Sequence, residues 1–189
     1  MKVPRALLII AALLVWLGFA LQSGYANADD FTADVMQVKA AYLFKFGSYV
    51  QWPPEVFADE HSPLVIGVLA DDVLADELVR VAMGRQIDKR PVSVKRMQPG
   101  DSVNGVHILF ISQQAGPPAA HLLLVAEGQP VLCVTEDAHG LPRGSVINFV
   151  LDSNRLRFDV SLLAAERNRL QLSASLLAVA RKVQKDDIE

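Results

Sequence analysis

Apolar and polar residues alternate along this chain in blocks that predict strands and helices in turn. Short apolar runs bounded by turn residues are typical of strands that lie inside a sheet. Longer stretches with an apolar residue every three or four positions are typical of amphipathic helices. We therefore expect helices at 33–52, 71–84, 117–128 and 162–183, and strands at 63–70, 90–97, 106–112, 130–136, 145–151 and 155–161.

Capping and turn residues support this order of elements. Asp71 and Asp72 open the second helix, where carboxylates accept backbone N–H groups. Pro117 begins the third helix and Gly128 ends it. The polar residues 152–154 lie between the last two strands and indicate a hairpin. Alternating strands and helices predict a single three-layer α/β domain, with a mostly parallel central sheet, helices on both faces and a C-terminal β-hairpin as an antiparallel edge.

The first predicted helix is rich in aromatic residues. At 100° per residue, one stripe is expected to face the core, and it contains Val35, Val38, Tyr42, Phe46 and Tyr49. Phe44 projects about 160° from Tyr42, among the small residues Ala40, Gly47 and Ser48. Small residues beside a large apolar side chain allow another surface to approach closely. Phe44 is therefore a candidate contact for a partner or a second copy of the chain, and cover by a loop of the same chain is the alternative.

Residues 1–28 have the pattern of a secretory signal peptide. Lys2 and Arg5 precede an uncharged apolar run of 16 residues, and an A-x-A cleavage motif ends at Ala28. The run is shorter than the roughly 20 residues that cross a bilayer comfortably. Cleavage after Ala28 is therefore favoured over a membrane anchor, and the exported domain would comprise residues 29–189.

Charge and cysteine content narrow the range of functions. Removing Lys2 and Arg5 with the signal leaves 16 basic residues against 21 acidic ones, a net charge of −5. No basic surplus remains to neutralise phosphates, which argues against a general nucleic-acid binder. Cys133 is the single cysteine, so no intrachain disulfide can form. It lies in an apolar strand, and we expect a buried thiol rather than a reactive one.

Signatures of catalytic and metal sites are absent from the sequence. It has no nucleophile elbow, P-loop, dinucleotide-binding glycine pattern or paired histidines at metal-ligand spacing. We therefore expect no catalytic residue, cofactor or metal. The best polar cluster, residues 135–140, follows a strand at the end where open parallel sheets bind ligands. A solvated turn is the simpler interpretation, but a small-molecule site there would be lined by Glu136, Asp137, Arg143 and Asn148.

Four segments together resemble the YfiR family of exported bacterial proteins. They are VKAAYLFKFGSYVQWP, LVIGVLADD, VHILFIS and the stretch from GLPRGSVINF to SLLAVARKV. The first segment fits the family pattern K-A-x-Y-L-x-x-F-x-x-x-x-x-W-P. The last fits G-[GS]-x-I-x-F, then R-x-x-F, A-A and L-x-[LI]-S-x-x-L-L-x-x-A. The resemblance covers about residues 34–183, nearly all of the exported chain.

The resemblance implies a periplasmic domain that dimerises and acts without catalysis. The namesake represses an inner-membrane diguanylate cyclase by binding its periplasmic part, and an outer-membrane lipoprotein relieves the repression. A chain of this kind lowers cyclic di-GMP and biofilm formation. Some members carry cysteine pairs that couple function to redox state, and one such cysteine commonly stands where this chain has Val106. With Cys133 alone, that coupling cannot operate within one chain.

The docking surface for such a partner is expected to be apolar with an arginine-containing rim. Our candidates are Phe44, Arg167 and Arg169. The two arginines belong to residues 166–169, a charged and exposed corner between two helical pieces. Two other functions stay open: a periplasmic binding protein for a nucleotide or amino acid at the strand ends, and a hydrolase, which the lack of a nucleophile–base pair disfavours.

Overall fold

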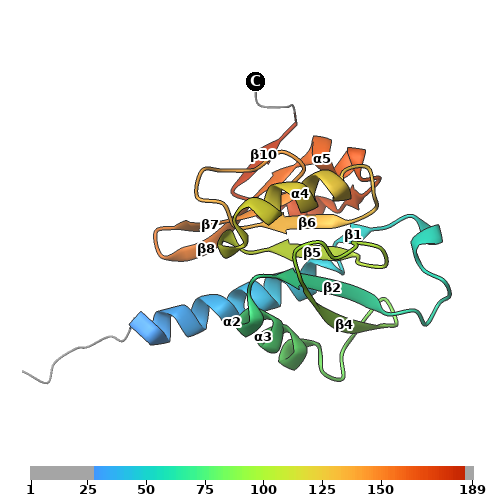
Figure 1. The fold of residues 1–189 in the computed structure, drawn as a ribbon, viewed down its shortest axis with the longest axis horizontal. Helices are drawn as coiled ribbons and strands as arrows, with labels where there is room; N and C mark the ends of the chain where they lie inside the picture. The colour runs from blue at the N-terminus through green and yellow to red at the C-terminus, as the bar shows by residue number, and fades with distance from the viewer. Residues whose placement is uncertain (1–27, 186–189) are drawn as a thin grey trace, which may run out of the picture. The chain divides into compact units, whose positions relative to one another are not determined.

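The computed structural model describes residues 28–185, so all but the last residue of the predicted signal peptide lies outside the described residues (Figure 1). Contacts divide the chain into a unit ending at Asp34 and a unit from Val35 to Glu189. The described part of the first unit is the beginning of helix α2 (Ala28–Phe46), and every described strand belongs to the second unit. No helix in residues 28–185 is long and apolar enough to cross a membrane.

A sheet of eight described strands is the centre of the second unit, in the order β10-β8-β7-β6-β5-β2-β4-β3 (Figure 1). Only the pairs β7/β8 and β3/β4 are antiparallel, which confirms the prediction of a mostly parallel sheet. The strands are β2 (Leu64–Leu69), β3 (Gln86–Ile87), β4 (Arg90–Met97), β5 (Ile108–Ile111), β6 (Leu132–Thr135), β7 (Ile147–Asp152), β8 (Arg155–Ser161) and β10 (Lys182–Gln184).

Helices cover both faces of the sheet, because successive strand residues point to opposite sides. Ile66, Ile108 and Phe110 lie in one core with α2, α3 (Asp72–Ala82), α5 (Leu162–Arg167) and α6 (Ala174–Val179). Leu109, Ile111 and Cys133 lie in a second core under α4 (Pro117–Ala126). The three-layer arrangement predicted from the sequence is therefore confirmed.

The predicted capping residues begin their helices as expected. The Asp71 carboxylate accepts a hydrogen bond of 2.9 Å from the backbone N–H of Leu74 and so caps α3. Helix α4 begins at Pro117, whose missing N–H costs nothing in the first turn. Gly128 follows α4 with a φ of 78°, a conformation that favours glycine.

Helix α2 ends earlier than the apolar pattern predicts. Its last residue is Phe46, and Val50–Gln51 form strand β1. This strand pairs antiparallel with β9 (Gln171–Leu172) in a separate two-stranded sheet. The predicted helix over 33–52 therefore contains a helix, a turn and a strand.

The predicted core stripe of α2 is only partly correct. Phe46 is buried and Tyr42 is partly buried, but Val38 and Tyr49 are 42% and 37% exposed. Tyr42 and Phe46 pack against Phe149 and Phe158 with ring centroids 5.3 to 6.1 Å apart. The aromatic side chains of this helix are thus part of one aromatic cluster with the β7–β8 hairpin.

Phe44 does not project into solvent, so the alternative of cover by the same chain describes this side chain. It is 7% exposed and belongs to the main core, with the Arg85 guanidinium 5.8 Å from its ring centroid. The surface that approaches the small residues comes from the same chain. A Cβ on Gly47 would lie 2.6 Å from Cδ1 of Ile87, so glycine allows strand β3 to reach the end of α2.

The C-terminal segment is less helical than predicted. Residues 162–183 form α5, β9, α6 and the start of β10 in place of one or two long helical pieces. Arg169 has a φ of 56°, which is incompatible with a continuing helix. Within this segment, Leu176 is buried, whereas Val179 is 57% exposed.

The predicted hairpin is present, but it is not the edge of the sheet. Ser153 and Asn154 both have positive φ, as the tight turns of two-residue hairpins require. Strand β10 then pairs in parallel with the outer side of β8. The edges of the described sheet are therefore β10 and β3.

Candidate functional site

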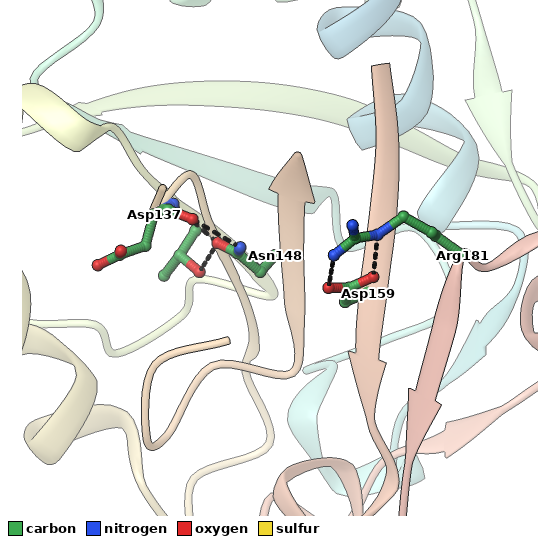
Figure 2. A network of polar contacts seen from close by, with 5 residues as sticks. Asp137, Asn148, Asp159 and Arg181 are labelled. Carbon is green, nitrogen blue, oxygen red and sulfur yellow. Dashed lines mark hydrogen bonds and ion pairs between the residues drawn. The ribbon is translucent and has the colours of Figure 1, made fainter. Parts of the chain in front are cut away.

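Asn148 connects the end of β6 to β7 through its side-chain amide. Its Oδ1 accepts hydrogen bonds of 2.8 Å from the Thr135 hydroxyl and from the Asp137 backbone N–H. Its Nδ2 donates to the Asp137 carbonyl at 3.0 Å (Figure 2). The side chain is completely buried, so these bonds replace the water that the amide loses. Asn148 therefore holds the loop after β6 in place.

Glu136, in the same loop, is paired with a buried lysine. Lys39 of α2 is 3% exposed, and its Nζ lies 2.6 Å from Oε1 of Glu136. A buried lysine needs such a carboxylate, because an unpaired charge in the interior is very costly. The sequence interpretation missed Lys39. Its spacing of four and seven residues from Leu43 and Phe46 places it on their side of the helix, and that spacing was the available signal.

Glu136 and Asp137 line a cavity of about 370 Å³ at the carboxyl ends of β5 and β6. The Asp137 carboxylate accepts a hydrogen bond of 2.7 Å from the backbone N–H of His139, which also lines the cavity. An apolar wall, including Ile111 and Leu123, completes it. No group of three metal-binding side chains in residues 28–185 could hold a metal ion.

Arg143 lies at a different cavity, of about 260 Å³, which Arg167 also lines. The Arg143 and Arg167 guanidinium groups lie 4.0 and 3.6 Å from the Glu127 carboxylate. The structure therefore places Glu136 and Asp137 at one cavity and Arg143 with Arg167 at another. The Asn148 side chain, from β7, is bonded to the loop after β6. Ligand binding by these residues stays a prediction, but they do not share one site.

The corner around Arg167 and Arg169 is held from inside by Asn168. This side chain is 2% exposed, accepts from the Gly128 backbone N–H and donates to the Val131 carbonyl, both at 2.9 Å. The charge pattern predicted that the whole corner is exposed, but the structure buries Asn168 in it. Arg169 is 56% exposed, with Nη1 3.5 Å from Oε1 of Glu55. Partner binding by the two arginines stays a prediction.

A bidentate ion pair joins Arg181, immediately before β10, to Asp159 of β8. The Arg181 guanidinium contacts both carboxylate oxygens of Asp159, at 2.8 and 2.5 Å (Figure 2). Asp159 is 5% exposed, and its hydrogen bonds to Arg181 raise the pKa of that guanidinium above its ordinary value. Nothing in the local sequence indicated this pair, because its members are 22 residues apart.

His107 lies in an aromatic stack that the sequence did not reveal. Its imidazole stacks on Phe57 with centroids 4.5 Å apart, and Trp52 contacts it edge-on at 6.2 Å. Burial lowers the pKa of His107, and the nearby Arg90 charge acts in the same direction.

Cys133 is completely buried, which confirms the prediction, and burial raises the pKa of its thiol to about 12.

No curated protein sequence gives a significant match. The sequence model of one family, described as YfiR/HmsC-like, matches residues 36–181, which is most of the chain and nearly all of the described α/β unit. The chain therefore belongs to the YfiR/HmsC-like family.

Proposed function

We propose that this chain is a periplasmic regulatory protein that represses an inner-membrane diguanylate cyclase and so lowers cyclic di-GMP and biofilm formation. The family match over residues 36–181 is the observation that carries the proposal. The family generally regulates diguanylate cyclase signalling, through regulatory proteins rather than enzymes. Export by the predicted signal peptide would place the domain where it meets the periplasmic part of such a cyclase.

The polar contacts of the described residues support a binding role. Asn148 is saturated by its own chain, Glu136 is paired with Lys39, and Asp159 is paired with Arg181. Side chains committed in this way stabilise a rigid surface and are poorly suited to exchange protons with a substrate. Rigidity suits a repressor, since a preformed surface loses little entropy when it binds.

Repression requires that the protein bind the inactive conformation of the cyclase more tightly than the active one. A shift from 1% to 99% inactive cyclase needs a preference of about 10⁴-fold. We assign the docking surface to the corner that carries Arg167 and Arg169. Arginine is enriched among the residues that dominate binding energy, and Arg169 is more than half exposed. Phe44 is buried, so we leave it out of the proposed surface.

The proposal is tested first in cells. Deleting the gene in a strain with an active partner cyclase is expected to raise cyclic di-GMP, measured by mass spectrometry. An unchanged level would overturn the repressor role. Relief by an outer-membrane lipoprotein and homodimerisation are further parts of the proposal, tested by co-purification and by sedimentation of residues 29–189.

The docking surface is tested with purified proteins. Arg169→Ala is expected to weaken binding to the periplasmic part of the cyclase at least tenfold, because Arg169 would contact the partner. Arg157→Ala is the matched control, since Arg157 is also exposed but lies on the hairpin strand β8. Equal affinities for the two variants would place the docking surface elsewhere.

A further inference from the structure

The loop Pro53–Pro63 is held on the sheet by one stack of rings. Phe57 of the loop lies flat on His107, with 8° between the ring planes, and Arg90 covers the other face of Phe57 at 3.8 Å. Arg90 also reaches the loop backbone, donating to the carbonyls of Asp59 and Ser62 at 2.6 and 3.1 Å. The loop is therefore fastened both by the stack on His107 and by Arg90.

The hydrogen bonds of His107 require a neutral ring. Its Nδ1 accepts a bond of 3.1 Å from the backbone N–H of Val65, near the start of β2. A nitrogen that accepts this bond carries no proton. The imidazole is 5% exposed, and Trp52 closes its edge with an indole Nε1 that is buried without a hydrogen-bond partner among the described residues. Little room or polarity is available to accommodate a charged ring.

We propose that His107 is a pH-operated clasp, which holds the loop Pro53–Pro63 on the sheet while its imidazole is neutral and releases the loop when the imidazole is protonated. A proton on Nδ1 would face the Val65 N–H, so two donors would oppose each other. The ring must then lose that bond or swing away, and either movement separates it from Phe57 and Trp52. Because Trp52 and Phe57 flank the loop's first turn, this movement frees the loop.

The surroundings of His107 favour the neutral ring. Arg90 is the charged side chain that acts on it, and its positive charge opposes protonation. Strands β2, β5 and β6, which adjoin His107, contain no charged residue. A hydrogen bond to the Val56 backbone favours the protonated ring, but burial outweighs it.

The carboxylates near the loop are engaged elsewhere. Glu55 lies 3.5 Å from Arg169. Asp59 is exposed and holds a turn, accepting from the His61 backbone N–H at 2.7 Å. Asp101, in the loop before His107, accepts from the Gln98 backbone at 3.0 Å. The remaining titratable side chains of the loop, those of Glu60 and His61, are exposed.

The direction of the pH dependence follows from the lowered pKa of His107. The closed loop is favoured in full above the ordinary histidine value of about 6.5, and that preference is lost as the pH falls through the lower value of the folded state. Between the two values, the open population is expected to rise up to about tenfold per pH unit, because one proton is taken up.

The clasp also reaches the surface assigned to the partner. Loop opening removes Glu55 from Arg169 and so changes the charge that this surface presents. Acid would thereby modulate partner binding. This last consequence rests on the proposed function, whereas the clasp itself does not.

The experiment uses residues 29–189, in which Trp52 is the only tryptophan. From pH 8 to pH 5, we expect a reversible change in Trp52 fluorescence with a midpoint below 6.5, with an unchanged far-ultraviolet circular dichroism spectrum. His107→Asn keeps an acceptor for the Val65 N–H but cannot titrate in this range, so its fluorescence is expected to stay constant. His61→Asn, which changes an exposed histidine in the same loop, is the matched control and is expected to follow the wild type.

A second measurement decides the matter if His107→Asn fails to fold. In wild-type protein, the NMR signals of the Val65 amide and the Trp52 indole are expected to shift with the same midpoint as the His107 ring. Titration of His107 with both other signals unchanged would overturn the clasp, as would equal fluorescence profiles for wild type and His107→Asn. If these signals change as expected but pH has no effect on partner affinity, the clasp is supported and only its link to the partner is overturned.

Discussion

At the scale of single residues, buried polar side chains decide how the loops of this protein are held. Asn148 and Asn168 each use both the carbonyl and the amino end of their amide to bond the backbone of another segment. Removing such a group leaves buried backbone donors and acceptors without partners, which costs about 1–3 kcal/mol each. The two asparagines therefore stabilise the loops that carry the candidate residues.

Cys133 illustrates how burial controls reactivity. The thiolate is the reactive form, and burial raises the pKa of this thiol to about 12, so at pH 8 roughly one thiol in ten thousand is ionised. We expect Cys133 to react with a disulfide reagent only as fast as the protein unfolds, measured by absorbance with and without denaturant. Ser153→Cys, at an exposed turn, is expected to react at once. Rapid labelling of the wild type under native conditions would contradict this.

At the scale of elements, the short strand β10 depends on its ion pair. It has three residues, all at least partly exposed, and pairs with β8 on one side only. Arg181 stands immediately before it, with its backbone N–H bonded to the Phe158 carbonyl at 2.8 Å and its guanidinium on Asp159. The side chain and the backbone of Arg181 thus both hold β10 against β8.

Arg181→Gln is expected to lower the free energy of unfolding by about 1–3 kcal/mol, because it leaves the buried Asp159 carboxylate without its cation. The double variant Asp159→Asn/Arg181→Gln is expected to lose less than the sum of the single changes. Arg157→Gln, an exposed change on β8, serves as the control and is expected to stay within about 0.5 kcal/mol of the wild type. Urea unfolding measures these variants together with Asp159→Asn and the wild type, and equal losses for the two single arginine variants would show that the pair does not anchor β10.

At the scale of the whole molecule, the pair Lys39–Glu136 joins segments 97 residues apart in the chain. It fastens helix α2 to the loop after β6, beside the aromatic cluster of α2 with β7 and β8. We therefore expect α2 from Val35 onward and the centre of the sheet to unfold together.

Glu136→Gln is expected to destabilise the protein by about 3 kcal/mol, because it leaves a buried ammonium without a carboxylate. Replacing both partners, as Lys39→Met/Glu136→Leu, is expected to restore most of the loss, since apolar residues of similar size avoid the desolvation cost. Lys45→Met, an exposed change on the same helix, is the control. Thermal unfolding checks the order of the variants. If the double variant is no more stable than Glu136→Gln, the buried charge is not the cause.

The amino-acid sequence alone was enough to predict the six longer strands and the helices between them, the mostly parallel sheet, the cap at Asp71 and the burial of Cys133. These features depend on hydrophobic period and on residues a few positions apart, and both can be read along the chain. The family pattern was equally visible, because it is a property of the sequence itself.

Only the tertiary structure decided which side chains meet. Phe44 is buried in the main core, and the predicted ligand residues are divided because Arg143 and Glu136 border different cavities. The contacts Lys39–Glu136, Arg181–Asp159 and His107–Phe57 join segments far apart in the chain. Helical period says which residues share a face, but the partner of that face is chosen by packing across the whole fold.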